Sequence, residues 1–301
     1  GTLTLRAKYG LKAEIPMELE VQAPVLPAPA DWQVHLDLWQ HPHAIARWHD
    51  VRPWSQEHLD LLRPIMKRLA EAGQKGITCS IIDEAWNGQT YDEWPSMVKW
   101  IRGADGAMRY DFSDFDRYVE LMMEVGVREQ ISCYTMLPWS LKVRYYDEAS
   151  GDYAFLELQP GEASYEEVWA PFLKALRDHV RAKGWLEKTC ISMDERPDAY
   201  MRSVIDIVSR HTPEFKIVSA VNAPSKLSEY IHDMSPVLTL AEFAPGELEK
   251  RHAEGKKTTF YVCMHPLKPN TYTASPTAES DGLCLLASAK WMDRFLRWAY
   301  T

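Results

Sequence analysis

Two acidic residues stand side by side at the end of an apolar run in the middle of the chain. Asp194 and Glu195 directly follow residues 188–193, and Pro197 marks the point where a strand would break. Because neighbouring residues of a regular strand point to opposite faces, the two carboxylates can share a ligand only at such a break. Two carboxylates can hydrolyse a glycosidic bond, one as an acid and the other as a base or nucleophile. The alternative is a solvated turn or a helix start, in which Asp198 caps the following helix.

Polar and aromatic residues also end most of the other apolar runs. In chain order they are Trp39 and His41, Asp83, Glu84 and Trp86, Tyr134 and Trp139, Asn222, Glu242, His265, and Trp298. If the runs are parallel strands of one barrel, these side chains converge, because the active site of such a barrel forms at the C-terminal strand ends.

Eight apolar runs alternate with helical patterns from Asp31 onward. Strands are expected at 32–39, 75–83, 129–137, 188–193, 215–222, 236–243, 258–265 and 296–300. Helices are expected at 55–73, 112–126, 164–184, 198–211, 225–234, 246–255 and 279–295. Strands that are apolar throughout, with a helix before each of the last seven, are typical of a parallel sheet covered by helices. Eight such units predict an α/β fold, a (β/α)8 barrel of the TIM type rather than an open doubly wound sheet.

The first residues follow a different pattern. Residues 1–21 alternate between apolar and polar types, which is typical of half-buried antiparallel strands. Two strands cannot stand alone, so residues 1–23 are expected to be the tail of an antiparallel β-sandwich domain. Residues 24–31 contain three prolines and predict a stiff linker. The catalytic barrel would then span 32–301, truncated after its eighth strand.

The composition excludes some kinds of binding partner and some kinds of site. The 301 residues include 34 Lys and Arg and 43 Asp and Glu, and the net charge of −9 argues against a nucleic-acid partner. The sequence contains no run of ~18 apolar residues, so no membrane span is predicted. The first four of five cysteines lie in strand-like runs and are expected to be buried thiols, without a disulfide framework or a metal. The chain begins with Gly1, which we interpret as a processed or shortened product. Its localisation is open: export from a bacterium is compatible with the sequence, because the lack of a signal sequence in this chain says nothing about export.

Several functions fit the residues alone. A metal hydrolase could use His41 and His43, but the ends of the later strands lack the further ligands that such a site needs. A two-carboxylate glycosidase would pair Glu195 with Glu84 or Glu242 from another strand. A third chemistry uses the adjacent pair of carboxylates itself. The non-enzymatic alternative is a protein that binds carbohydrate without turnover.

Four segments resemble glycoside hydrolase family 123, the β-N-acetylgalactosaminidases. They are CISMDERP (190–197), IIDEAWNG (81–88), HPLKPNTYTASPTAES (265–280) and FLRWAY (295–300). The resemblance covers the chain from Trp32 to its end, and the first strands resemble the end of that family's β-sandwich domain. It implies removal of β-linked N-acetylgalactosamine from a glycan or glycolipid, with retention and without a cofactor. The 2-acetamido group of the substrate would attack the anomeric carbon and form an oxazoline.

The resemblance also implies roles for individual residues. Asp194 would accept a hydrogen bond from the acetamide N–H and stabilise the developing positive charge. Glu195 would protonate the leaving oxygen and then activate water. Weaker candidates for substrate binding have core packing or another structural role as their alternative. Four tryptophans could form a sugar platform or the pocket for the acetamide methyl group: Trp39, Trp86, Trp139 and Trp298. Tyr134 could bind the acetamide oxygen, Tyr272 could lie in a loop over the pocket, and sugar hydroxyls could be bound by Asn222, Glu242, His41 and His265. The sequence leaves the choice between galacto and gluco sugars open.

Overall fold

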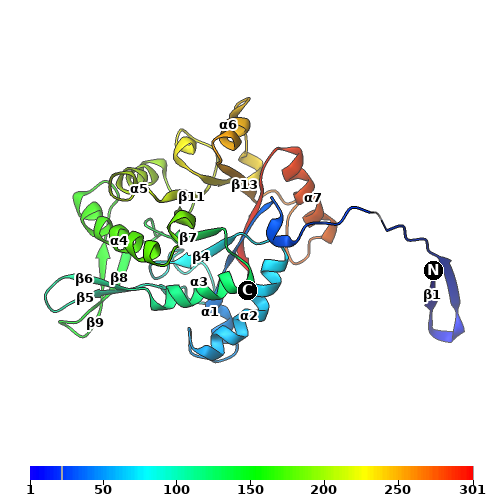
Figure 1. Cartoon of the computed structure of the whole chain (residues 1–301), viewed down its shortest axis with the longest axis horizontal. Coiled ribbons are helices and arrows are strands. Elements are labelled where there is room, and N and C mark those ends of the chain that lie inside the picture. The colour runs from blue at the N-terminus through cyan, green and yellow to red at the C-terminus, as the bar shows by residue number, and fades with distance from the viewer. Residues whose placement is uncertain (22, 301) are drawn as a thin grey trace.

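The main body of the molecule is a barrel of parallel strands. The computed structural model describes residues 1–21 and 23–300, whereas Gln22, in the predicted tail, and Thr301, at the end of the predicted barrel, lie outside the described residues. Eight strands form one sheet in the order β3-β14-β13-β12-β11-β10-β7-β4, nearly closed and surrounded by helices (Figure 1). The strands are β3 (His35–Gln40), β4 (Gly76–Ser80), β7 (Gln130–Tyr134), β10 (Thr189–Met193), β11 (Lys216–Val221), β12 (Asp233–Pro236), β13 (Lys257–Tyr261) and β14 (Arg294–Tyr300). The predicted (β/α)8 fold is confirmed.

Amphipathic helices cover the outside of the sheet. They are α1 (Pro42–Trp48), α2 (Gln56–Glu71), α3 (Ser113–Val125), α4 (Ala163–Ala182), α5 (Asp198–His211), α6 (Glu247–Ala253) and α7 (Thr277–Ala289). The short helix α1 was not predicted, and α7 ends earlier than expected. No helix among the described residues has both the length and the apolar character that a bilayer crossing requires.

Side chains join the first and second strands of the barrel. β3 and β4 share one isolated bridge, between Leu36 and Gln74. Further along, the Gln74 side chain accepts a hydrogen bond from the N–H of Leu38 (2.9 Å), and the Gln40 side chain accepts one from the N–H of Thr78 (2.9 Å). A side-chain amide offers the same donors and acceptors as a peptide group, so it can replace part of the backbone ladder. These bonds hold the C-terminal end of β3 at the mouth of the barrel.

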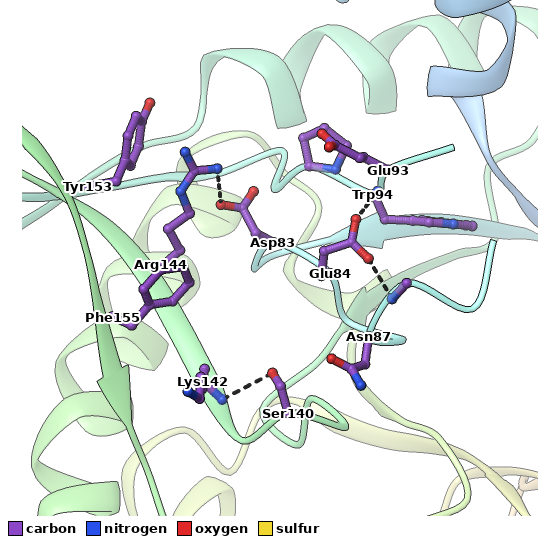
Figure 2. Close-up of a pocket in the computed structure, with 12 residues that line it drawn as sticks. Asp83, Glu84, Asn87, Glu93, Trp94, Ser140, Lys142, Arg144, Tyr153 and Phe155 are labelled. Atoms are coloured by element: carbon purple, nitrogen blue, oxygen red, sulfur yellow. Dashed lines mark hydrogen bonds and ion pairs between the residues drawn. The ribbon is translucent and has the colours of Figure 1, made fainter. Parts of the chain in front are cut away.

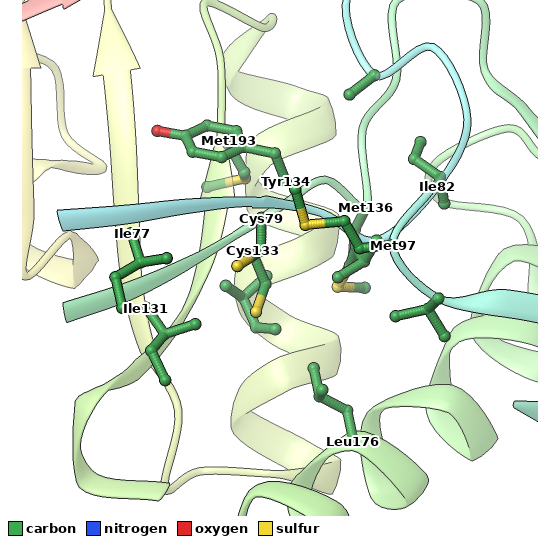
Figure 3. Close-up of a cluster of buried hydrophobic side chains, with 14 of the residues drawn as sticks. Ile77, Cys79, Ile82, Met97, Ile131, Cys133, Tyr134, Met136, Leu176 and Met193 are labelled. Atoms are coloured by element: carbon green, nitrogen blue, oxygen red, sulfur yellow. The ribbon is translucent and has the colours of Figure 1, made fainter. Parts of the chain in front are cut away.

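The layer between the barrel strands and the surrounding helices is densely packed. Ile77 and Cys79 of β4 lie close to Ile131 and Cys133 of β7, and all four side chains are fully buried (Figure 3). Such packing fixes the strand ends, because interiors of this density leave side chains little freedom to shift.

The five cysteines are free thiols, and one of them departs from the expectation. Cys79, Cys133 and Cys190 are buried as predicted. Cys263, which we expected inside a buried strand, is exposed because β13 already ends at Tyr261.

A buried polar layer lies toward the N-terminal end of the barrel. The carboxylate of Asp233 lies 2.9 Å from His35 Nε2 and accepts a hydrogen bond from the Gln130 amide (3.1 Å). Burial alone would raise the pKa of Asp233, but His35 and Gln130 outweigh it and lower that pKa to about 2. Burial raises the pKa of Asp37, within reach of the same network, to about 6. His35, Asp233 and Gln130 each begin a strand, so this network lies at the end of the barrel opposite the predicted site.

A second sheet, which the sequence analysis did not predict, lies beside the barrel. Its order is β6-β5-β8-β9, with β5 (Lys99–Arg102), β6 (Met108–Asp111), β8 (Lys142–Asp147) and β9 (Asp152–Glu157). One face is buried, where Trp100 stacks on Phe172 of α4 with ring centroids 4.5 Å apart. These strands lie in the connections that follow β4 and β7, so the sheet extends from the end of the barrel where the predicted site lies.

The sixth barrel strand lies earlier in the chain than expected. We predicted a helix at 225–234 and a strand at 236–243, but β12 starts at Asp233 and only the 3-10 turn η4 (Ser228–Tyr230) precedes it. The Ser225 hydroxyl accepts from the N–H of Leu227 (3.1 Å), and the Ser228 hydroxyl accepts from the N–H of Ser225 (3.0 Å). Local bonds of this kind compete with helix formation. The segment after β12 forms a second 3-10 turn, η5 (Leu238–Leu240).

The first strands form a separate hairpin. β1 (Thr2–Arg6) and β2 (Lys12–Pro16) pair antiparallel, and an extended segment connects them to the barrel (Figure 1). Leu3, Leu5 and Ile15 share one face of the hairpin and are exposed. The linker contains the 3-10 turn η2 (Pro29–Asp31), and the Trp32 indole donates a hydrogen bond to the carbonyl of Pro27 (2.9 Å).

Candidate active site

Asp194 and Glu195 lie where β10 opens into its loop. All residues of β10 are buried, and the strand register places Ser192 beside Tyr134 of β7. Both carboxylates are half-buried. Helix α5 begins beyond them, with Pro197 as its N-cap. The pair is therefore neither a helix cap nor a fully solvated turn, which were the alternatives considered from the sequence.

The two carboxyl groups influence each other's protonation. Burial raises the pKa of Glu195 to about 7, and the negative charge of Asp194 contributes to that increase. Burial also raises the pKa of Asp194, although hydrogen bonds from the Trp139 indole and from the N–H of Glu195 oppose this. Within residues 1–21 and 23–300, no salt bridge reaches either carboxylate. Near neutral pH the pair can therefore hold one proton, and the hydrogen bonds that favour the ionised form of Asp194 make Glu195 the better site for it.

Trp139 holds the first of these carboxylates in place. Its indole Nε1 donates a hydrogen bond to Asp194 Oδ2 (2.8 Å). The backbone N–H of Trp139 donates to the carbonyl of Ala85 (3.3 Å), and the Arg196 guanidinium lies over the indole ring, 4.6 Å from its centroid. The sequence suggested a sugar platform for Trp139. The residue is 36% exposed, and its indole N–H is engaged with Asp194, an arrangement that can orient this carboxylate.

An aromatic cluster fills the mouth of the barrel beside the pair. Tyr134 lies 4.6 Å from Trp39 and 5.2 Å from Trp86, measured between ring centroids. Trp298 stacks on Trp86 at 6.3 Å. Trp39 and Trp86 are each 2% exposed, so in this conformation they pack against one another as the floor of the mouth.

Tyr134 carries an unused hydrogen-bonding group. Its side chain is fully buried, and among the described residues its hydroxyl has no hydrogen-bond partner. Buried tyrosine hydroxyls normally have one. Burial raises the pKa of Tyr134, and the charges of Asp37 and Asp194 raise it further. The phenol therefore stays protonated and offers a donor within electrostatic reach of Asp194.

The carboxylates that end β4 organise a loop. Glu84 has a φ of +49°, and its two oxygens accept hydrogen bonds from the N–H groups of Trp94 and Gly88, each at 2.8 Å. Asp83 accepts one from the N–H of Ser96 (2.7 Å) and lies 3.4 Å from Arg144. Both groups are thus engaged in shaping residues 83–96, the loop that contributes Trp86 to the aromatic cluster. Nothing in the sequence indicated the bonds that shape the loop, because the donors at Gly88, Trp94 and Ser96 are backbone N–H groups.

The remaining candidates lie in loops or beneath the aromatic cluster. Asn222 and Glu242 are exposed in the connections after β11 and β12. Tyr272 is 39% exposed, and its hydroxyl donates to the carbonyl of Cys263 (3.0 Å), which anchors its loop after β13. His41 is buried, accepts a hydrogen bond from the N–H of Ala44 (3.3 Å) and packs edge-on against Trp94. His265 is exposed, also in the connection that follows β13. The structure thus brings Asp194, Glu195 and Trp139 together beside the cluster of Tyr134, Trp39, Trp86 and Trp298. It leaves Asn222, Glu242, His265 and Tyr272 in loops and buries His41 against Trp94.

Comparison with known proteins identifies the family. The family model of the glycoside hydrolase 123 catalytic domain matches residues 39–301. This chain belongs to glycoside hydrolase family 123. A family 123 glycoside hydrolase from Clostridium perfringens, studied for glycolipid glycan hydrolysis, is 28% identical, with a TM-score of 0.89 over 96% of this chain and 53% of that one. The chain therefore spans about half the length of that enzyme. No match was found among curated proteins.

Other glycosidase structures are more distant. A GH113 β-mannanase from Alicyclobacillus acidocaldarius is 13% identical, with a TM-score of 0.43 over 90% of this chain and 88% of that one. A family 5 mannosidase from Rhizomucor miehei is 14% identical, with a TM-score of 0.42 over 80% and 76%. Because the matching family model is that of a catalytic domain, the barrel of this family 123 chain is where glycoside hydrolysis is expected.

The histidines that suggested a metal hydrolase do not form a ligand set in this family 123 barrel. His43 is buried 5.0 Å from Trp54, between ring centroids, and burial lowers its pKa to about 3. Over the described part of the chain, no group of three or more histidine, cysteine or acidic side chains is arranged to hold a metal ion.

A groove of about 710 Å³ lies between the loop that follows β4 and the β8–β9 hairpin (Figure 2). One wall is the loop that follows β4, and the other is the outward face of β8 and β9. Ser140, the residue after Trp139, is among its lining residues, whereas Asp194 and Glu195 are not.

Proposed function

We propose that this family 123 barrel removes terminal β-linked N-acetylgalactosamine from glycan chains by a retaining, substrate-assisted mechanism. The observation that carries the proposal is the adjacent carboxylate pair at the end of β10, in which burial and the Asp194 charge raise the pKa of Glu195 to about 7. Enzymes that use the acetamide of the substrate are exceptions to the carboxylate separations of ordinary glycosidases, so two neighbouring acids suit this chemistry.

In the first step the acetamide oxygen attacks the anomeric carbon. Asp194 accepts a hydrogen bond from the acetamide N–H and offsets the positive charge that spreads over the forming oxazolinium ring. The Trp139 indole donates a hydrogen bond to Asp194 Oδ2 and so orients the carboxylate. Because the orientation of Asp194 is fixed before the substrate arrives, its charge needs no reorganisation during the reaction.

Glu195 moves the protons in both steps. In its protonated form it donates a proton to the glycosidic oxygen as the bond to the leaving group breaks. The resulting carboxylate then takes a proton from the water that opens the oxazoline and releases the sugar. A pKa near the working pH suits a group that must first donate a proton and then accept one.

The buried aromatic cluster supports a role in holding the acetamide. An apolar floor of Trp39 and Trp86 suits the acetamide methyl group, and the Tyr134 hydroxyl is a donor that suits the acetamide oxygen. A donor that is buried without a partner is costly, so a ligand that supplies an acceptor gains binding energy there.

The mechanism predicts that kcat/KM decreases at alkaline pH. Since Glu195 must be protonated in the free enzyme, kcat/KM should fall as pH rises through about 7 and then decrease about tenfold per pH unit. We expect this for glycosides with poor leaving groups. Steady-state kinetics between pH 4 and pH 9 measures it, and a profile that stays flat to about pH 9 would contradict the assignment of Glu195.

Paired substrates and inhibitors test the proposed function directly. Aryl β-GalNAc should be hydrolysed, and the rate on aryl β-GlcNAc measures the discrimination between the two sugars. An N-acetyl thiazoline, which mimics the oxazoline, should inhibit tightly, whereas a 2-fluoro sugar should not trap a covalent intermediate. Covalent trapping with weak thiazoline inhibition would instead indicate a two-carboxylate glycosidase. Binding of the sugar without release of product would indicate a non-catalytic protein.

A further inference from the structure

Arg196, the residue after the carboxylate pair, has no acidic partner. Its side chain is half-buried, and within residues 1–21 and 23–300 it forms no salt bridge. Its Nε is buried and has no hydrogen-bond partner among the described residues. Burial lowers the pKa of Arg196, as expected for a cation that is withdrawn from water. Such a cation needs a compensating interaction of another kind.

The Arg196 guanidinium lies over the ring of Trp139, 4.6 Å from the ring centroid. The negative face of an indole attracts a cation, and a planar guanidinium suits it well. The edge of the same ring is engaged with Asp194, because the indole N–H donates a hydrogen bond to its Oδ2 (2.8 Å). One indole thus links the cation on its face to the carboxylate at its edge.

A cation on the face of an indole strengthens the hydrogen bond at its edge. The positive charge draws the electron density of the ring toward itself, so the N–H becomes a better donor. A better donor favours the ionised form of the carboxylate that accepts from it. The charge of Arg196 also acts on Asp194 directly, and it lowers the pKa of that carboxyl group together with the Trp139 bond. Both effects oppose burial, which raises the same pKa.

The other titratable groups around this arrangement supply no second cation. They are Glu195, Tyr134 of β7, Tyr165 of α4 and Tyr200 of α5. Burial raises the pKa of Tyr134 and of Tyr165, so both phenols stay neutral. The pKa of Glu195 is raised to about 7, so this group carries a proton at acidic pH. In the described part of the chain, Arg196 is therefore the one cation that acts on the pKa of Asp194.

We propose that Arg196 is a positioning residue of the active site, which acts through the Trp139 ring to keep Asp194 ionised for the acetamide group. The inference rests on the proposed function, in which Asp194 must be negatively charged to offset the oxazolinium ring. The role requires no contact between the guanidinium and the substrate. A substrate without any charge should therefore reveal it.

The test uses a neutral aryl β-GalNAc with a good leaving group and steady-state kinetics between about pH 4 and pH 8. In the wild type, kcat/KM should fall as pH decreases through the pKa of Asp194, because protonation removes the charge that the mechanism needs. In Arg196→Met this acid limb of the profile should lie about half a pH unit or more higher, since less opposes the effect of burial. On the limb, kcat/KM should thus be about threefold lower or more, and the difference should shrink toward neutral pH.

Two further variants serve as controls. Arg196→Lys keeps the charge, so its acid limb should lie closer to that of the wild type than the limb of Arg196→Met. Arg202, in α5, is the matched control, because its guanidinium also lies over an aromatic ring, 4.7 Å from the centroid of Tyr230. Arg202→Met should leave the profile unchanged. Circular dichroism confirms that each variant is folded. An acid limb that stays in place in Arg196→Met, or a loss that is equal at every pH, would overturn the inference.

A double-variant cycle tests the route through the ring. Trp139→Phe keeps an aromatic face for Arg196 but removes the N–H that bonds to Asp194. If the effect acts through this bond, Arg196→Met should move the acid limb clearly less in the Trp139→Phe background than in the wild type. A full shift in that background would overturn the role of the indole.

An NMR titration separates the inference from the catalytic proposal. The signal of the Trp139 indole N–H, assigned by its loss in Trp139→Phe, should shift as Asp194 loses its proton. The midpoint of this titration should be higher in Arg196→Met than in the wild type, and the shift should be absent in Asp194→Asn. If the enzyme hydrolyses no β-GalNAc substrate, the proposed function is wrong, and the titration still decides the role of Arg196. Equal midpoints for the wild type and Arg196→Met would refute that role.

Discussion

Glu195→Gln should lower kcat/KM by about 10²–10⁴-fold on a β-GalNAc glycoside whose leaving group is a poor one, such as another sugar. Glutamine has nearly the same shape as glutamate, so binding and packing should change little. It cannot donate a proton to the departing oxygen, and it cannot take one from water in the second step. The loss should therefore appear mainly in kcat.

The leaving group decides how much of this loss is seen. A nitrophenolate departs without protonation, so the first step on an activated aryl β-GalNAc should survive the change. The alkaline decrease of kcat/KM through about pH 7 should also disappear in the variant, because the group that titrates there has been removed. Rates measured on a series of aryl leaving groups should become steeply dependent on leaving-group pKa.

A second glutamate serves as the control for Glu195. Glu187 lies before the other end of β10, in the 3-10 turn η3 (Leu186–Lys188), and is exposed. Glu187→Gln should leave both substrates unaffected. A Glu195→Gln variant whose loss is mild and equal on good and poor leaving groups would show that this residue does not supply the proton.

The barrel was predictable because its signal is local. A parallel strand covered on both sides must be apolar along its whole length, so runs such as 129–137 and 188–193 are visible without knowledge of their partners. The position of Asp194 and Glu195 follows from the same signal, since a polar pair directly after such a run falls at a strand end. The environment of the pair did not follow. Its partner Trp139 comes from the neighbouring connection, 55 residues earlier in the chain.

The second sheet was missed because its alternation is mixed. Along β8 the buried residues Val143 and Tyr145 alternate with Lys142 and Arg144, which is an ordinary pattern for a half-buried strand. Tyr146 departs from this alternation, because it places a large ring on the exposed face.

The position of the sixth strand was predicted wrongly for a different reason. Residues 236–243 are apolar enough for a strand, but Asp233, at the start of the actual strand β12, is a buried carboxylate. Its burial depends on His35, which lies far earlier in the chain, in the first barrel strand β3. A charge that is stabilised by so distant a partner looks like a surface residue in the sequence.

Asp194→Asn should lower kcat/KM by about 10²–10³-fold on good and poor leaving groups alike, which separates it from Glu195→Gln. The acetamide oxygen forms its bond to the anomeric carbon as the bond to the leaving group breaks, whatever that group is, so a better one cannot compensate. The asparagine keeps the size of the side chain, and its oxygen can still accept the hydrogen bond from Trp139. What is lost is the negative charge that offsets the developing positive charge.

The same change should alter the pH profile of the activity that remains. The charge of Asp194 helps to raise the pKa of Glu195, so in Asp194→Asn the alkaline decrease of kcat/KM should begin at a lower pH than in the wild type. Asp198, exposed in the first turn of α5, is the matched control, and Asp198→Asn should preserve both rate and profile. A variant that only disturbed the fold would lower the rate without moving the profile. If Asp194→Asn keeps the wild-type alkaline limb, the two carboxyl groups do not act as a coupled pair, and the acetamide-assisted assignment of Asp194 and Glu195 fails with it.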